Sequence, residues 1–525
     1  MLYHIAGIKI PFQEDQTEAL YSRIIKKGFV RNGIVSYRIL KRSLDSRRKN
    51  DIHYLYQVEI EYDGALSREA AGVAAVISEP EVFRRPIPVS GRVAVIGAGP
   101  GGLFAALSLA RMGFNPVIIE RGKKVDQRSI DVQRFWTDAV LNEDSNMQFG
   151  EGGAGTFSDG KLTTRIQNPR IHTVFKELVA AGAPPEILYD YKPHIGTDLL
   201  VTVVANLRRK IEQLGGVFRF ETRLTDWVER DGSITELILS GGERLPVGLV
   251  FLATGHSARD TYALLHRKGT ALATKSFAVG TRIQHPQELI QRMQYGPHWD
   301  NPKLPTASYR FSHSFRSGGE DRGVFSFCMC PGGEVVSAAS EHGCSLVNGM
   351  SNSARDGRFA NSAIVVAVGP RDYGSDLMDG LRYQRNLEQQ HYNAAGYGAV
   401  FQRLEDFRCN KASRGGIESS FRMELAPGNL QQTLPDEVVQ GLLSGFSSWS
   451  RVKSFIHPDA VLIGHETRTS SPLRILRDAR GFSISHDNLL PVGEGAGYAG
   501  GIVSAAVDGI RAVESACTSP VVDTA

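Results

Sequence analysis

Cysteine and long apolar segments are what this sequence of 525 residues most clearly lacks. It has only 5 cysteines, so a secreted domain held together by disulfides is not expected and a reducing compartment is favoured. The first residues, MLYHIAGIKIPFQED, show neither the basic nor the apolar region of a signal peptide. No apolar run approaches the ~18–20 residues that span a bilayer. The sequence predicts a cytoplasmic protein that does not associate with membranes.

A strong net charge is missing as well. The 60 basic and 56 acidic residues leave a formal charge of +4, which excludes a polycation. The excess is local, because residues 21–49 contain ten Lys or Arg and a single acid, Asp45. Such a segment is more often a solvated basic face than a nucleic-acid surface. RNA is therefore retained as an alternative partner that the sequence does not favour.

Glycine, in contrast, is abundant, with 55 residues that gather in clusters. The apolar segment RVAVI, which begins at position 92, is typical of a strand in a buried parallel sheet. It is followed by the loop GAGPGG, then by a helical segment, and then by a second strand, NPVIIE. This is a βαβ unit that carries the fingerprint Gly97-x-Gly99-x-x-Gly102. Gly97 permits the tight turn, Gly99 lets backbone N–H groups approach a pyrophosphate, and Gly102 allows helix and strand to pack closely.

An acid follows the fingerprint at the spacing expected of a ribose ligand. Glu120 ends the second strand about 20 positions after Gly97. Its carboxylate can accept hydrogen bonds from ribose hydroxyls and would repel a 2′-phosphate. The site is therefore predicted to take FAD or NAD rather than NADP.

The same glycine spacing occurs twice more, at Gly150-x-Gly152-x-x-Gly155 and at residues 495–500. The first of these follows a polar segment, so it is not a Rossmann loop. The second lies between a strand and a helix, but too little sequence follows it for a complete nucleotide-binding unit. No full second Rossmann unit is apparent between residues 256 and 454, so any NADH or NADPH is expected to bind only transiently.

Three segments resemble a known superfamily. VAVIGAGPGGLFAALSLARMGFNPVIIERG is similar to the FAD-binding start of the glutathione-reductase/hydroxybenzoate-hydroxylase superfamily. LVFLATG resembles its mid-chain ATG motif, and LPVGEGAGYAGGIVSAAVDG its C-terminal motif. The resemblance implies that Glu494, where Asp is usual, binds the ribitol chain. It also implies that the next helix points its N-terminus at the flavin pyrimidine edge.

The resemblance extends to a family of NAD(P)/FAD-dependent oxidoreductases, through the strings FGEGGAGTFSDGKL, HIGTD, ATGHSARDT, FCMCPGG and ETRTSSPLRILRD. In this comparison the loop at 152–156 either passes close to the isoalloxazine ring or is a plain surface loop. No metal site is expected, because the histidines lack ligand spacing. The predicted cofactor is FAD, and its predicted contacts are Gly97, Gly99, Pro100, Gly102, Glu120, Arg121, Gly153, Thr156, Leu224, Ala253, Thr254, Gly255, Gly493, Glu494, Gly497 and Gly500.

Polar residues that could serve a substrate gather in two segments, 161–165 and 465–474. The candidate catalytic residues are Lys161, His465, Arg468 and Arg474. The two arginines could bind a carboxylate or phosphate on the substrate. Alternatively they pair with Glu466 and Asp478 or contact the FAD phosphates.

Two further pairs allow a functional and a structural interpretation. His194 and Asp198 could act as acid and base, or Thr197 or Asp198 could cap the helix that follows. Cys328-x-Cys330 could be a redox dithiol, although it lacks the C-x-x-C spacing of dithiols that face a flavin. Small apolar strand residues are the simpler explanation for the cysteines.

The sequence thus predicts an α/β protein with a Rossmann-like FAD-binding domain, an inserted mixed α+β substrate domain and a small N-terminal α+β domain. The expected ranges are 1–90 for the small basic domain, 91–270 for the first FAD-binding part, 271–454 for the substrate or cap domain and 455–525 for the return. The expected function is an FAD-dependent oxidoreductase that transfers a hydride between flavin and a small anionic substrate. An RNA-modifying flavoenzyme and a non-catalytic flavin-binding scaffold or sensor are the alternatives.

Overall fold

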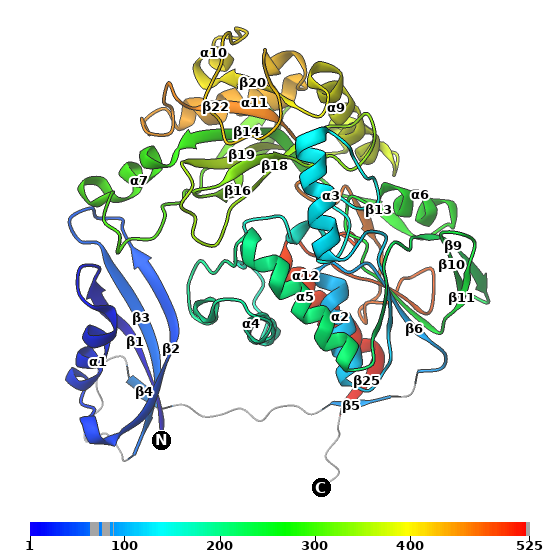
Figure 1. Cartoon of the computed structure of the whole chain (residues 1–525), viewed down its shortest axis with the longest axis horizontal. Coiled ribbons are helices and arrows are strands. Elements are labelled where there is room, and N and C mark those ends of the chain that lie inside the picture. Colours follow the sequence, from blue (N-terminus) through cyan, green and yellow to red (C-terminus); the bar gives the residue numbers. More distant parts are fainter. Residues whose placement is uncertain (64–72, 76–83, 88, 521–525) are drawn as a thin grey trace.

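The computed structural model describes residues 1–63, 73–75, 84–87 and 89–520. A small α+β unit begins the chain (Figure 1). Its four-stranded sheet has the order β2-β3-β1-β4, and Leu20 and Ile24 of α1 pack against Val58 and Ile60 of the sheet. The elements are β1 (Leu2–Pro11), α1 (Gln16–Lys26), η1 (Arg31–Gly33), β2 (Ile34–Asp45), β3 (His53–Tyr62) and β4 (Val73–Ala75).

The basic segment of this unit is partly neutralised by acids. Arg42 forms a bidentate ion pair with Asp190, at 2.6 and 2.9 Å, and so joins the small unit to the following domain. Arg38 pairs with Glu59 at 2.6 Å within the unit itself. The charge available to a nucleic acid is therefore lower than the composition of residues 21–49 suggests, and RNA stays an untested alternative partner that the sequence does not favour.

A five-stranded parallel sheet of order β24-β12-β6-β7-β8 forms the centre of the second unit. Its strands are β6 (Val93–Ile96), β7 (Val117–Ile119), β8 (Val217–Arg219), β12 (Leu249–Leu252) and β24 (Leu489–Pro491). Strand β6 is buried on both faces, as its apolar sequence predicts. Val93 and Val95 face the helices, whereas Ala94 and Ile96 face a smaller sheet.

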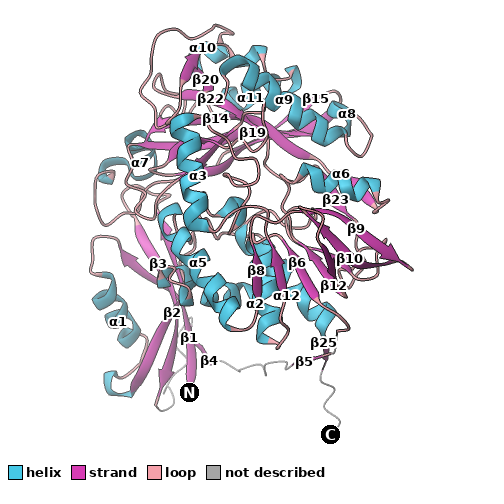
Figure 2. Ribbon diagram, turned by 45° about the vertical axis from the view of Figure 1, so that its right-hand side comes forward, coloured by secondary structure: helices cyan, strands magenta, loops and turns pink. Residues whose placement is uncertain are grey.

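Helices cover one face of the parallel sheet, and an antiparallel meander covers the other (Figures 1 and 2). The helices are α2 (Pro100–Arg111), α4 (Arg170–Ala180), α5 (Thr197–Gln213) and α12 (Ile502–Cys517), with α3 (Val125–Asp138) beyond them and the turn η3 (Pro185–Leu188) after α4. The meander consists of β9 (Leu224–Arg230), β10 (Ser233–Leu239) and β11 (Arg244–Pro246), followed after β12 by α6 (Arg259–Arg267). Asp231 and Gly232 both have positive φ and form the tight turn between β9 and β10.

The inserted domain is built on a seven-stranded sheet of order β15-β16-β19-β14-β22-β20-β21. Its strands are β14 (Phe277–Pro286), β15 (Ser312–Ser317), β16 (Glu320–Cys330), β19 (Phe359–Val368), β20 (Ala399–Arg403), β21 (Leu425–Pro427) and β22 (Val461–Glu466). Neighbours are antiparallel except β20 and β21, so the sheet is not a second Rossmann unit. Strand β22 lies beyond residue 454, so this sheet extends past the predicted boundary.

Helices and small ribbons complete this domain. The helices are α7 (Gln287–Tyr295), η4 (Gly296–His298), α8 (Pro370–Tyr373), α9 (Asp379–Ala395), α10 (Leu404–Arg408), η5 (Leu430–Gln432) and α11 (Asp436–Ser448). The ribbons pair β13 (Leu272–Thr274) with β23 (Leu473–Ile475), and β17 (Glu334–Ser337) with β18 (Val347–Met350). A third ribbon joins β5 (Arg84–Pro86) to β25 (Thr518–Pro520) near the C-terminus.

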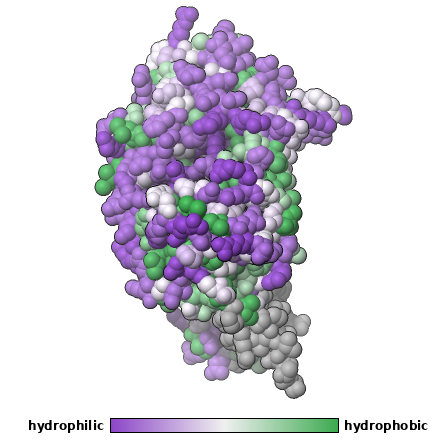
Figure 3. Space-filling view, turned by 90° about the vertical axis from the view of Figure 1, so that its right-hand side faces the viewer, coloured by the Kyte–Doolittle hydropathy of each residue, from purple (hydrophilic) through white to green (hydrophobic). Residues whose placement is uncertain are grey.

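On the side of the molecule shown in Figure 3, apolar residues form only small groups among hydrophilic ones. Among the described residues, every helix is too short or too polar to cross a lipid bilayer.

Candidate functional site

A cleft opens at the carboxyl ends of the parallel strands, where ligands bind in open α/β sheets. Its cavity volume is about 380 Å³, within the ~300–1,000 Å³ of small-molecule sites. The turns after β6, β7, β12 and β24 all line it, and segments of the cap domain face it. The predicted cofactor contacts that line the cleft are Gly97, Gly99, Pro100, Glu120, Arg121, Gly153, Leu224, Ala253, Thr254, Gly255, Gly493, Glu494 and Gly500.

The three fingerprint glycines have different surroundings. Gly97 has φ +100°, and a Cβ there would lie 2.5 Å from the carbonyl oxygen of Ala253. A Cβ at Gly102 would collide with the carbonyl oxygen of Gly97, so helix α2 approaches the turn as closely as the sequence predicts. At Gly99 a Cβ would meet only Gly153 Cα, at 3.8 Å. Gly99 therefore leaves room for a ligand at the N-terminus of α2.

The C-terminal glycine cluster presents a second helix N-terminus to the same cleft. Gly501 is the N-cap of α12, and a Cβ at either Gly500 or Gly501 would enter open space. Helix α12 reaches this position by packing on α2, because a Cβ at Gly509 would collide with the Gly101 carbonyl oxygen. Both helix N-termini supply positive potential to the cleft.

The glycine loop at residues 150–155 lies in the cleft and is not a plain surface loop. Its short helix η2 (Gly153–Gly155) lines the cavity, and the Gly152 N–H donates to the carbonyl of Ala98 at 2.8 Å. Arg128 of α3, which was not among the residues predicted from the sequence, holds the loop in place through hydrogen bonds. Its guanidinium is fully buried and donates to the carbonyl oxygens of Glu151 and Gly153 at 2.7 and 2.9 Å.

Glu120 joins three turns of the site. Its carboxylate accepts the backbone N–H groups of Ala98, Gly122 and Gly150, at 2.8, 3.0 and 3.0 Å. Because a carboxylate has about four acceptor positions, roughly one remains for a ribose hydroxyl. Glu120 therefore lines this end of the cleft and also holds the three surrounding turns together. Arg121 beside it is held by Asp260, at 2.8 and 2.9 Å.

Three predicted cofactor residues lie behind the lining. Gly102 packs on the turn as described above. Thr156 is buried and donates its hydroxyl to the Glu151 carbonyl at 3.1 Å, so it stabilises the glycine loop. A Cβ at Gly497 would lie 2.8 Å from the Leu473 carbonyl oxygen, so this glycine allows the chain to pass β23.

An acid and an imidazole meet where β12 and β24 end. His256 Nε2 lies 3.9 Å from Glu494 Oε1. Burial raises the pKa of Glu494 to about 7, and burial lowers the pKa of His256 to about 3. In the described structure the buried Nδ1 of His256 has no hydrogen-bond partner. This end of the cleft thus holds a neutral histidine and an acid that titrates near neutrality, both able to bond a polyhydroxylated ligand.

Replacing Glu494 by Gln is expected to stabilise the FAD-free protein at about pH 8 and to change little at about pH 4. A carboxyl group whose pKa is raised on folding does not lower the free energy of unfolding when the pH is below its unfolded pKa of ~4.3. Above its folded pKa it lowers that free energy by the full amount. For Glu494 the penalty develops as the pH rises through about 7. Thermal unfolding of both proteins across this range measures the difference. A constant offset at every pH would contradict it.

The four candidate catalytic residues divide into two groups. Lys161 and Arg468 line the cleft, whereas His465 and Arg474 do not. His465 is fully buried and hydrogen-bonded to Thr433 and to the Leu387 carbonyl, at 2.9 and 3.2 Å. Burial lowers its pKa to about 4, so it is a neutral core residue and not an acid or base of the site.

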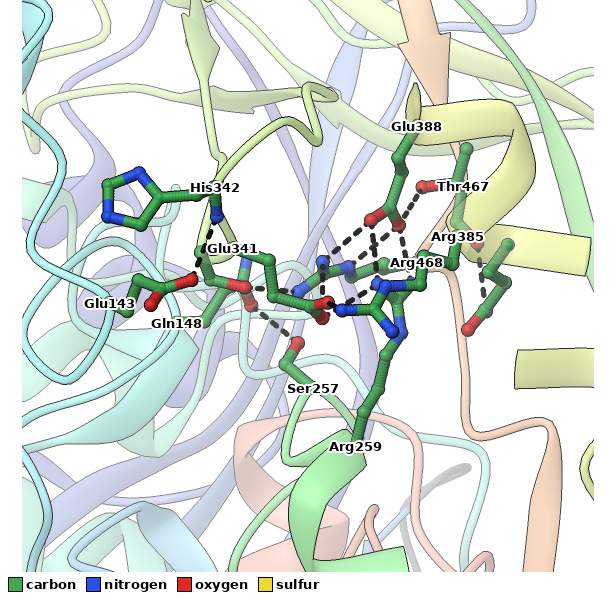
Figure 4. Close-up of polar contacts among 12 residues, drawn as sticks. Glu143, Gln148, Ser257, Arg259, Glu341, His342, Arg385, Glu388, Thr467 and Arg468 are labelled. Atoms are coloured by element: carbon green, nitrogen blue, oxygen red, sulfur yellow. Dashed lines mark hydrogen bonds and ion pairs between the residues drawn. The ribbon is translucent and has the colours of Figure 1, made fainter. Parts of the chain in front are cut away.

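Arg474 is exposed and stacks on Tyr498, with its guanidinium 5.1 Å from the ring centroid. Arg468 is not available to a substrate either, because it forms a bidentate ion pair with Glu388 at 2.9 and 2.8 Å (Figure 4). The proposed partner Glu466 instead binds Arg282. Arg468 therefore takes the ion-pair alternative, with Glu388 as its partner, and a substrate or FAD contact of Arg474 stays a prediction.

The HIGTD segment has a structural role, though not the predicted one. Helix α5 begins at Thr197 itself, and its N-cap is Gly196, without a side-chain cap. Asp198 accepts the N–H and hydroxyl of Ser353, both at 2.7 Å, so it ties the helix to a loop of the cap domain. His194 Nε2 lies 3.2 Å from the Ser353 carbonyl oxygen.

Sequence reasoning missed a buried acid that lies where the cleft meets the cap domain. Asp159 is fully buried and lines the cavity. Its carboxylate binds Lys161 at 3.1 Å and Arg355 at 2.9 Å, and it accepts the hydroxyl of Ser351. The string FGEGGAGTFSDGKL contains this acid two positions before Lys161, a spacing that could have suggested the pair.

Known proteins resemble this chain at three levels. Residues 276–469 match the family described as FAD-dependent protein, C-terminal domain-like, and residues 3–61 match a domain of unknown function. A protein of Clostridium beijerinckii named only as uncharacterised is 44% identical over 95% of this chain and 96% of its own. Mitochondrial dihydrolipoyl dehydrogenase of Canis lupus familiaris is 32% identical, over 17% of this chain and 18% of that enzyme.

Solved structures show more distant similarity. The tetracycline destructase Tet(51) covers 81% of this chain and 80% of its own, at 12% identity and a TM-score of 0.32. The halogenase PltM in complex with FAD covers 80% of this chain and 67% of its own, at 10% identity and a TM-score of 0.37. Similarity at this level identifies no reaction.

The residues of the cleft fit FAD on their own geometry. Gly99, Gly500 and Gly501 leave open space where side chains would stand, and two helix N-termini face it. An acid lies at each end, Glu120 after β7 and Glu494 after β24. Together with the whole-length relative and the match of its cap domain, these features show that the chain belongs to the family of FAD-dependent, oxidoreductase-type proteins, with FAD as its cofactor.

Proposed function

We propose that this flavoprotein is an oxidoreductase in which a hydride passes between the flavin and a small anionic substrate. The observation that carries the proposal is the pair formed by Lys161 and Asp159 on the cap-domain side of the cleft. Asp159 faces two cations, Lys161 and Arg355, so the group has a net positive charge. Of these two cations Lys161 lines the cavity. An anionic group on a substrate would find its counter-charge there.

Lys161 is a cation at neutral pH. Burial alone would lower its pKa, but the neighbouring Cys330 and Asp159 outweigh burial and raise it. Its ammonium carries three donors, of which one is directed to Asp159 and a second to Cys330 Sγ, 4.0 Å away. The remaining donor can hold a substrate carboxylate or phosphate.

The flavin, when bound, supplies hydride chemistry at N5. The chain's own contribution is to bind the cofactor through Gly99 and the α12 N-terminus, to orient the substrate through Lys161, and to keep His256 neutral. No second nucleotide domain occurs in the described part of the chain, so a nicotinamide donor would have to enter the same cleft transiently.

Anaerobic stopped-flow mixing of the FAD-loaded protein with NADH, NADPH and a panel of small carboxylates and phosphates tests the proposal. Bleaching of the flavin band near ~450 nm by an anionic metabolite is the expected result. A flavin that no member of the panel reduces would favour the scaffold or sensor alternative. Salt-sensitive RNA binding that is lost when residues 1–90 are removed would favour the RNA-modifying alternative.

Lys161→Met is expected to raise the KM for the anionic substrate about 10-fold or more, because it removes one charge-assisted hydrogen bond worth ~1.5–3 kcal/mol. FAD content should stay unchanged, since the ammonium belongs to the substrate side. Steady-state kinetics with the substrate found in the panel measure the effect. Lys192→Met is the matched control, because Lys192 bonds to Ser308 and does not line the cleft. Equal KM values for both variants would remove Lys161 from the site.

A further inference from the structure

Strand β16 carries an irregularity where it reaches the cleft. Its pairing with β19 shifts between Phe327 and Cys330, so one extra residue is accommodated there. Cys328, inside this bulge, has φ +44°, a left-handed conformation that is uncommon for a residue with a side chain. Both Phe327 and Cys328 line the cavity that holds the cofactor residues. The bulge thus turns a cysteine out of the sheet and into the cleft.

A second cysteine lies directly behind the first. Cys330 is fully buried, and its Sγ lies 3.3 Å from the Cys328 carbonyl oxygen. The Cys330 thiol donates to this carbonyl, and neither cysteine forms a disulfide. One sulfur therefore faces the cleft while its neighbour is shielded from solvent.

Two cations flank the pair. The ammonium of Lys161 lies 4.0 Å from Cys330 Sγ. The guanidinium of Arg282, which is fully buried and paired with Glu466, lies 3.4 Å from the Cys328 carbonyl oxygen. Such an electropositive, partly exposed environment distinguishes reactive cysteines from inert core cysteines.

The electrostatics assign different protonation states to the two sulfurs. The neighbouring Cys330 side chain is the main cause that lowers the pKa of Cys328, and Lys161 and Arg282 lower it further against the effects of burial and Asp159. The Cys328 side chain and burial raise the pKa of Cys330. Cys328 also contributes to raising the pKa of Glu494, so the thiolate interacts with the acid at the cofactor end of the cleft.

We propose that Cys328 and Cys330 form a dithiol–disulfide couple through which an electron pair passes from the flavin cleft to a small disulfide. This inference rests on the proposed oxidoreductase function and names the class of its electron acceptor. Cys328 is the attacking sulfur because it lines the cleft, and Cys330 is the resolving sulfur because it is shielded behind it.

The exchange balances in two steps. The Cys328 thiolate attacks one sulfur of the small disulfide, whose S–S bond breaks and releases one thiol product, which takes up a proton from solvent. Cys330 then gives up its proton and attacks Cys328, and the second thiol product leaves with that proton. The chain retains the new S–S bond. Return to the Cys328 thiolate and the Cys330 thiol takes an electron pair and one proton, which reduced FAD would supply when bound in the cleft, with its second proton released to solvent.

Reaction of the prereduced protein with glutathione disulfide tests the couple without any flavin turnover. After alkylation of the remaining thiols, mass spectrometry should find the peptide that carries Cys328 and Cys330 unmodified and two hydrogens lighter. In Cys330→Ser the same treatment should leave glutathione attached to Cys328. Cys409→Ser is the matched control, because it removes an exposed, distant thiol and should not alter the pair. Alkylation of both cysteines in the treated wild type would overturn the proposal.

An anaerobic dithionite titration of the FAD-loaded protein supplies a second readout. The oxidised wild type should consume one electron pair per chain more than Cys328→Ser before reduction is complete. Equal consumption by the two proteins would overturn the proposal, even where a substrate reduces the flavin. Failure of the proposed function is distinguishable, because no substrate would then bleach the flavin although glutathione disulfide still oxidised the pair.

Discussion

Gly99→Val is expected to weaken FAD binding by about 100-fold or more while the protein remains folded, a loss of ~2.7 kcal/mol. The backbone at Gly99 has φ −76°, which any residue adopts, and a Cβ there would meet only Gly153 Cα at 3.8 Å. An added Cβ therefore strains nothing within the chain. The valine methyl groups would fill the space through which the N–H groups of the α2 N-terminus reach a pyrophosphate.

Quenching of flavin fluorescence measures the affinity of Gly99→Val, and thermal unfolding without FAD measures its stability. Gly416→Val is the matched control, because a Cβ at Gly416 meets nothing within 4 Å and Gly416 does not line the cleft. Gly102→Val should behave differently from both, since its side chain collides with the Gly97 carbonyl and destabilises the fold itself. A Gly99 variant that binds FAD as tightly as the wild type would show that the pyrophosphate lies elsewhere.

The nucleotide end of the site was predictable because its chemistry is local in sequence. The turn from Gly97 to Gly102 and its acid Glu120 belong to one βαβ unit, and the backbone conformation that each glycine allows is fixed within a few residues. The same holds for the meander turn at Asp231, which two adjacent residues determine. Short-range rules of this kind require no knowledge of the tertiary fold.

The substrate side was predicted poorly because its residues are defined by partners distant in sequence. In the sequence Arg468 is indistinguishable from a free anion ligand, but in the fold α9 places Glu388 beside it. His465 could likewise be an acid or base by its sequence position, but in the fold it is buried on β22 of the cap sheet. Cys328 faces the cleft only because β16 and β19 lose register beside it. Strand register and helix placement are tertiary properties, and neither is encoded in the spacing of residues along one segment.

The ion-pair network between the two large domains carries the second large effect. Glu388 of α9 is fully buried and binds Arg468 at 2.9 and 2.8 Å and Arg259 of α6 at 2.8 and 2.9 Å (Figure 4). The side chains of Arg468 and Arg259 are only 3% and 11% exposed. Glu388→Gln removes the carboxylate that binds both buried cations, and among the described residues it leaves them Glu341, which lies 2.7 Å from Arg259 and 3.7 Å from Arg468. The free energy of unfolding is expected to fall by about 3–5 kcal/mol, measured by urea denaturation at neutral pH.

The pH dependence of this loss separates charge from packing. Burial alone would raise the pKa of Glu388, but Arg259 and Arg468 outweigh it and hold the pKa far below its usual range. The stabilisation is therefore complete above the unfolded value of ~4.3 and is lost as the pH falls toward the folded one. The stability difference between wild type and Glu388→Gln should shrink in acid. Arg382→Ala, on the exposed face of the same helix, should cost less than ~1 kcal/mol at any pH. A Glu388→Gln protein as stable as Arg382→Ala would mean that the two arginines find other partners, and that the domain interface does not depend on this carboxylate.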